Sequence, residues 1–409
     1  MSLMDKLEPA KVDKVLEGLK VVDSDTHYTE PHDLWTSMVP EKYKTLMPHV
    51  VRNDKGRDVW LINGDQVLTS SGGAHSAIMP NGLKNNFWEV DITEGPQLED
   101  IHPCAYDIPE RLKAMDAMNV HAQIVYPNTL GFGAARLVDL EDKQLAVDIV
   151  KVYNDAMAQK QAESGNRMFP QACLPFWDVK EAAREVERCK KELKLTGITM
   201  CPEPQFVGSL PDIQDRHWDP LWEACTDNDM PINFHIGATP PNQPFGSDVW
   251  PSHDRYRKWV IACALLESGQ SRILANLVCG DLLERFPKTK WVNVESGIGW
   301  IPFILERVEY QLYESDPKDP ALVDYNRPTP TELFKRQVYA CFWFEKAGPG
   351  RVLDIIGFDN VLFESDFPHP TCLYPNPVER ALKALEPWGE EVQRKVMGEN
   401  AKKLYNLPI

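Results

Sequence analysis

The sequence lacks the features of a membrane or disulfide-bonded protein. Its 409 residues contain no run of about eighteen apolar residues, which a membrane-spanning helix would need. The first twenty residues mix charged with apolar side chains and lack the apolar centre of a secretion signal. The nine cysteines are scattered singly, with no CxxC pair. We therefore expect a cytoplasmic protein with reduced thiols and no thiolate zinc site.

Positive charge is also scarce. The chain has 44 Lys and Arg against 61 Asp and Glu, a net charge of −17. Such a field repels nucleic acid and anionic lipid, so we expect a small-molecule substrate and neither of those partners. No GxGxxG or Walker motif follows any expected strand, which removes the usual reason to expect an open, doubly wound sheet.

What the chain does contain is a regular alternation of short β-rich runs and longer segments of helical period. The expected strands are residues 20–25, 122–126, 171–175, 197–201, 231–235, 291–295, 338–342 and 360–365. The expected helices are residues 138–164, 179–193, 219–228, 256–286, 301–313 and 347–356. Eight strands with intervening helices predict one α/β domain over residues 1–409, a (β/α)₈ TIM barrel.

Two segments interrupt this alternation. Residues 46–104 contain an expected hairpin with "NDKG" as its turn, and we interpret the segment as an insertion after the first strand. It would serve as a lid or as the contact of a homodimer or larger homo-oligomer. Residues 236–256 form a long, Pro-rich loop directly after a strand, and long loops inside compact domains are usually functional or mobile.

Polar residues stand where four of the expected strands end, which is where a barrel places its active site. They are Asp25, His27, His235, Glu295 and Asp366, with His369 just beyond. Asp25 and His27 are two residues apart, so in an extended chain their side chains share one face. Each residue alone has an ordinary structural explanation, but together they favour a metal site. Imidazole and carboxylate ligands suit one divalent ion, zinc first and manganese as an alternative.

Three further residues are candidates for substrate binding. Arg255 and Arg257 follow the Pro-rich loop and could hold a substrate carboxylate through two hydrogen bonds, although such charges more often form a solvated helix face. Trp300 is a candidate for contact with a planar substrate.

The segments "DSDTH", "PINFHIG", "VESGIGWIPFILERVE", "LFESDFPHP" and "GENAKKLYNL" resemble the amidohydrolase superfamily over nearly the whole chain. The resemblance is to the amidohydrolase-related branch that contains aminocarboxymuconate-semialdehyde decarboxylase and γ-resorcylate decarboxylase. It implies a distorted (β/α)₈ barrel whose single metal ion is held by Asp25, His27, His235 and Asp366. The fourth strand, "TGITMCP", offers no residue that could bridge a second ion.

One departure from the family pattern bears on function. Glu295 stands where the decarboxylases that this chain resembles carry a His. The resemblance implies a metal-dependent decarboxylase or carbon–carbon lyase for a small aromatic or unsaturated carboxylic acid. Asp366 is then the first candidate for proton transfer, followed by Glu295 and His369. A carboxylate at position 295 would repel an anionic substrate, so a hydrolase of amides, esters, lactones or C–C bonds is the alternative. A catalytically silent barrel that only binds a partner is a third.

Overall fold

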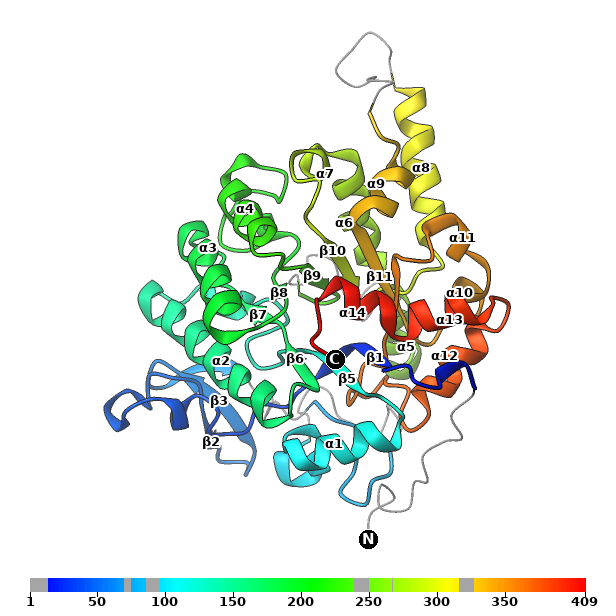
Figure 1. Cartoon of the computed structure of the whole chain (residues 1–409). Helices are drawn as coiled ribbons and strands as arrows, with labels where there is room; N and C mark the ends of the chain where they lie inside the picture. The colour runs from blue at the N-terminus through cyan, green and yellow to red at the C-terminus, as the bar shows by residue number, and fades with distance from the viewer. Residues whose placement is uncertain (1–13, 70–74, 86–95, 239–249, 267, 316–326) are drawn as a thin grey trace.

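Short parallel strands lie at the centre of the molecule and helices surround them (Figure 1). The computed structural model describes residues 14–69, 75–85, 96–238, 250–266, 268–315 and 327–409. The central strands are β1 (Val22–His27), β5 (Ala122–Tyr126), β6 (Met168–Pro170), β7 (Ala172–Cys173), β8 (Ile198–Thr199), β9 (Ile232–His235), β10 (Trp291–Val294), β11 (Val338–Phe342) and β12 (Val361–Phe363). Every strand expected from the sequence is present, so the prediction of the barrel strands is confirmed.

The strands pair in the order β1–β5–β6 and β7–β8–β9–β10–β11–β12. β6 and β7 are one strand that changes partner at Gln171. The Gln171 N–H donates to the Val125 carbonyl at 2.9 Å, and the next N–H, that of Ala172, donates to the Gly197 carbonyl at 2.9 Å. The third strand therefore runs from Met168 to Cys173, earlier than the predicted 171–175.

The barrel closes between β12 and β1 through irregular contacts. The His27 N–H donates to the Phe367 carbonyl at 2.8 Å, and the Asp366 N–H donates to the Asp25 carbonyl at 3.0 Å. We call this junction, residues 23–27 with residues 364–367, the seam. The result is a distorted (β/α)₈ barrel, as expected.

The helices follow the strands with some changes from the prediction. They are α1 (Ile108–Ala117), α2 (Lys143–Glu163), α3 (Val179–Arg188), α4 (Asp219–Asp227), α5 (Arg255–Leu266), α6 (Ser268–Cys279), α7 (Leu282–Arg285), α8 (Ile301–Glu314), α9 (Pro330–Gln337), α10 (Ala347–Arg351), α11 (Leu353–Ile356), α12 (Pro377–Leu385), α13 (Glu390–Arg394) and α14 (Asn400–Leu404). α1, α9 and α12 to α14 were not expected.

Two helix boundaries differ for identifiable reasons. α2 begins at Lys143 and not at residue 138, because the Asp142 side chain accepts from the Leu145 N–H at 2.9 Å and caps the helix there. The segment 256–286 is not one helix: α6 ends before Gly280. The Gln214 side chain packs where a Cβ of Gly280 would lie and accepts from the Leu282 N–H, which starts α7.

The insertion after β1 is a small antiparallel sheet of β2 (His49–Arg52), β3 (Asp58–Ile62) and β4 (Gln66–Thr69). The expected turn is present, since the Asn53 side chain accepts from the N–H groups of Lys55 and Arg57. β4 is an additional strand. Trp60 of β3 is fully buried against Trp35, which joins this sheet to the barrel. Parts of the insertion (70–74, 86–95) and of the Pro-rich loop (239–249) lie outside the described residues.

An apolar floor closes the barrel end at which the strands begin. Leu404 and Tyr405, at the end of α14, form one buried cluster with Val22 and Ala122, the first residues of β1 and β5. In Figure 1, α14 lies across the middle of the strands. The opposite end, where the strands finish, is thus the one available for chemistry. Among the described helices, none combines the length and the apolar character that crossing a membrane requires.

Candidate metal centre

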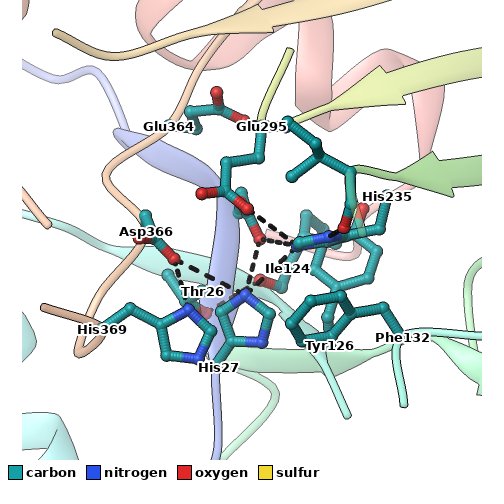
Figure 2. A network of polar contacts seen from close by, with 12 residues as sticks. Thr26, His27, Ile124, Tyr126, Phe132, His235, Glu295, Glu364, Asp366 and His369 are labelled. Atoms are coloured by element: carbon teal, nitrogen blue, oxygen red, sulfur yellow. Dashed lines mark hydrogen bonds and ion pairs between the residues drawn. The ribbon is translucent and has the colours of Figure 1, made fainter. Parts of the chain in front are cut away.

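The carboxyl ends of β1, β9 and β12 bring four buried side chains together (Figure 2). His27 Nε2 lies 3.5 Å from Asp25 Oδ1, 3.6 Å from Asp366 Oδ1 and 3.2 Å from His235 Nε2. His235 Nε2 lies 3.4 Å from Asp25 Oδ1. Two ligand atoms bound at about 2.0–2.2 Å to one ion lie roughly 3–3.5 Å apart, so these separations suit a single ion.

The carboxylates fit a cation because no described donor satisfies them. Both oxygens of Asp25 and Oδ1 of Asp366 are buried and accept no hydrogen bond from any described residue. Buried carboxylate oxygens without a donor are costly, and a divalent ion offsets that cost. With two imidazoles and no thiolate, the set suits zinc, manganese or iron. The residues present therefore fit one divalent metal ion.

The two imidazoles of the centre are held in different ways. His235 Nδ1 lies 2.6 Å from the Ile236 carbonyl, which requires a proton on Nδ1 and leaves Nε2 bare toward Asp25. Burial disfavours the charged form of His235, but the Asp25 carboxylate, the Ile236 carbonyl and the Asp366 carboxylate together outweigh this and raise its pKa. Burial lowers the pKa of His27 well below its ordinary value, and nearby imidazoles add to the effect. Burial raises the pKa of Asp25 despite its contact with His235.

Two carboxylates reach the centre from a backbone conformation that residues other than glycine rarely adopt. φ is +52° at Glu295 and +60° at Asp366. Such positions cost of order 1–3 kcal/mol and persist where surrounding contacts impose them. The Glu295 N–H donates to Glu364 Oε2 at 3.0 Å, and Asp366 Oδ2 accepts from the Thr371 hydroxyl at 2.6 Å. Glu295 Oε2 then lies 3.8 Å from His235 Nε2.

His369 and Phe132 line the centre beside these ligands. The His369 ring stacks on His27 with centroids 3.7 Å apart, and its Nδ1 lies 2.8 Å from Asp366 Oδ1. Phe132, in the loop after β5, lies 4.2 Å from the His235 ring and 5.0 Å from the His27 ring, measured between centroids. The sequence did not single out Phe132, because nothing in the chain indicates how that loop folds back.

Two acidic residues of the seam were also missed. Asp23 is buried and accepts from the Ser365 N–H at 2.8 Å, and burial raises its pKa to about 8. Burial raises the pKa of Glu364 well above its ordinary value. The signal was available, since both residues stand two positions before a predicted ligand, in "DSD" and "ESD".

The three predicted substrate-binding residues stand at the N-terminal ends of α5 and α8. Arg255 and Arg257 are exposed in the first turn of α5, where the Arg257 guanidinium pairs with Asp254. The Trp300 indole is partly buried and donates to the Ser296 carbonyl at 2.7 Å. The partners of Arg257 and Trp300 in these two contacts are thus Asp254 and Ser296, and not the four ligand candidates. Their roles in substrate binding stay predictions.

Comparisons with known proteins show which family the chain resembles. The model of the amidohydrolase family matches residues 99–407. A γ-resorcylate decarboxylase of Polaromonas sp. is 26% identical over 275 residues, 63% of this chain and 76% of that protein. A 2-amino-3-carboxymuconate-6-semialdehyde decarboxylase of Dictyostelium discoideum is 22% identical over 324 residues, 77% of this chain and 81% of that protein.

A solved structure supports the fold. It is a dihydroxybenzoic acid decarboxylase from Polaromonas sp. with bound manganese and the inhibitor 2-nitroresorcinol. It aligns with a TM-score of 0.62 at 18% identity and covers 96% of this chain and 98% of its own. At that identity the likeness shows the barrel fold alone.

Proposed function

The chain belongs to the amidohydrolase family, and on that premise we propose that it is a metal-dependent decarboxylase. Its substrate would be a small aromatic or unsaturated carboxylic acid. The observation that carries the proposal is the pair of Asp366 and His369 at the centre. Asp366 Oδ1 accepts no hydrogen bond from a described residue, and His369 Nδ1 lies 2.8 Å from it. Decarboxylases among the relatives support the same reaction class.

The chemistry requires a proton at the carbon that loses the carboxyl group. Asp25, His27, His235 and Asp366 would hold the divalent ion, which supplies positive charge for an anionic oxygen of the substrate. Asp366 gives a proton to the ring carbon that bears the carboxylate. The carbon–carbon bond then breaks, carbon dioxide leaves, and the bonding pair restores the ring. His369, beside Asp366 Oδ1, returns a proton to Asp366.

We propose manganese or zinc as the ion. Nitrogen and oxygen ligands without thiolate accept either. Manganese is supported by its presence in the dihydroxybenzoic acid decarboxylase and in a 5-carboxyvanillate decarboxylase of Novosphingobium aromaticivorans.

Glu295 favours a second candidate, a hydrolase. Its carboxylate is 13% exposed and lies near His235 Nε2, so it can take a proton from a water molecule at the edge of the centre. The same negative charge disfavours a substrate carboxylate placed beside it.

The test is a panel of hydroxylated benzoic acids and unsaturated acids, labelled with ¹³C in the carboxyl group and incubated with manganese- or zinc-loaded protein in D₂O. We expect labelled carbon dioxide, with one deuterium at the carbon that lost it, and turnover at least about a hundredfold slower in the Asp366→Asn variant. A parallel panel of amides, esters and lactones tests the alternative. Hydrolysis there, with no carbon dioxide from any acid, would contradict the decarboxylase and support the hydrolase.

A further inference from the structure

We infer that Asn128 is a positioning residue that fixes the tautomer of His369. Asn128 is the second residue after β5 and is 3% exposed. Its Oδ1 lies 2.9 Å from His369 Nε2, while its Nδ2 donates to the Tyr28 carbonyl at 3.0 Å. The inference rests on the proposed function for one point only, the proton that His369 carries in the reaction.

The Tyr28 carbonyl decides which way the Asn128 amide is turned. A carbonyl oxygen only accepts hydrogen bonds, so the Asn128 atom that faces it must be the NH₂ group. The reversed amide would place two acceptor oxygens 3.0 Å apart inside the protein. Asn128 Oδ1 therefore faces His369, and because an amide oxygen only accepts, His369 Nε2 must carry a proton.

A proton on Nε2 determines what Nδ1 presents to the centre. Nδ1 is then the ring nitrogen that exchanges a proton with Asp366 Oδ1, 2.8 Å away, and because both atoms are acceptors when bare, one of them holds that proton. The ring can take a proton at Nδ1 and pass it to Asp366 without rotating, since the stack on His27 holds its plane. In the other tautomer Nδ1 would already be protonated and Nε2 would meet the Asn128 oxygen without a hydrogen. Asn128 thus selects the form of His369 that proton transfer requires.

Glu30 keeps Asn128 in place. Its carboxylate is 2% exposed and accepts from the Asn128 N–H at 2.8 Å and from the Thr129 hydroxyl at 3.0 Å. Arg136 donates to the Thr129 carbonyl at 2.8 Å from the other side. Charged groups thus clamp the backbone of the loop that carries Asn128, so the amide has a fixed base from which to reach both partners.

The first test reads the tautomer directly and needs no substrate. Full-length zinc-loaded protein labelled with ¹⁵N-histidine is compared by NMR with the Asn128→Ala variant, and the His369 signals are assigned by their loss in His369→Gln. We expect Nε2 of His369 to be protonated in the wild type, and both tautomers to appear in Asn128→Ala. The matched control is Asn154→Ala, which removes another buried asparagine that binds the Cys173 backbone away from the centre.

Kinetics with an acid that the wild type decarboxylates form the second test. We expect Asn128→Ala to keep its metal and to lose roughly tenfold to a hundredfold in kcat, with a much smaller change in KM, as for other residues that orient a catalytic group. Asn154→Ala should lose stability without this loss. A bare Nε2 in the wild type, unchanged His369 signals in Asn128→Ala, or loss of metal from that variant would overturn the inference. If no acid is turned over, the proposed function fails while the NMR result still decides the tautomer.

Discussion

The β12–β1 seam and the β9–β10–β11 wall are built differently. In the wall, consecutive residues of β10 pair in register with β9 and β11, from Trp291 onward. At the seam, by contrast, a single bridge between Thr26 and Phe367 replaces a continuous ladder. Side chains supply the remaining links, such as Asp23 to Ser365.

The difference shows how the seam brings three of the four ligands together. A regular ladder alternates side chains between the interior and the helices, so it delivers one inward residue for every two. The irregular seam turns Asp366 into the left-handed region, and its carboxylate meets His27 and Asp25 from β1. At the seam regular pairing is lost, and several charged groups point to one place instead.

Neutralising a seam carboxylate should have the largest effect. Asp366→Asn removes both the proton donor and one negative ligand, so we expect kcat to fall by about 10²- to 10⁴-fold, the range of general acid catalysis. Carbon dioxide release is the measurement. Asp354→Asn, an exposed change in α11, is the control and should retain wild-type activity.

Removal of the metal should lower the stability of the protein, because the seam holds the two buried carboxylates. Buried carboxylate oxygens of Asp25 and Asp366 lose the cation that offsets their charge, so the chelated protein should melt at a lower temperature. An ion present at about one hundred times its Kd should raise the free energy of unfolding by roughly 2.7 kcal/mol. Calorimetry with and without added metal checks this, and His235→Ala should show little response. If added metal raised the melting temperature of the wild type and of His235→Ala equally, the proposed site would be wrong.

Matched variants separate stability from function. Asp23→Ala leaves the Ser365 N–H without its acceptor at the seam, and Val292→Ala leaves a cavity in the wall. Each variant should lower the free energy of unfolding, measured in urea, by about 1–3 kcal/mol. Only Asp23→Ala should also weaken metal binding. Equal metal affinity in both variants would mean that the seam has no special role.

The smallest expected effect concerns the apolar side chain that lines the centre. Phe132→Ala removes the ring that lies against His235 and His27, which should lower kcat/KM by about tenfold, or roughly 1.4 kcal/mol. Phe303→Ala, at a 67% exposed position of α8, is the control. If Phe132→Ala matches this control, Phe132 does not contact the substrate.

Much of this fold could be predicted from the sequence because the residue patterns that indicate strands are local. Short branched or aromatic runs predicted every strand of the barrel, and the polar residues that end those runs supplied Asp25, His27, His235 and Asp366. The seam itself was not predicted, since a break in pairing depends on two strands more than 300 residues apart in a chain of 409. Asn128 was missed for the same reason: its role appears only when the loops after β1, β5 and β12 are brought together.

Local capping explains the helix boundaries that differed. The Asp142 cap of α2 is visible in the sequence as an acidic residue before the helical run. The end of α6 at Gly280 is not, because it depends on Gln214, a residue far away in the chain.

The central claim is that Asp25, His27 and Asp366 of the seam and His235 of β9 hold one divalent ion. The most direct measurement is elemental analysis of protein purified without chelator or a nickel column, compared with His235→Ala purified in the same way. We predict about one manganese or zinc ion per chain in the wild type, with near-complete loss in the variant. Wild-type protein that stays metal-free after incubation with both ions, or a variant that keeps the ion, would contradict the account.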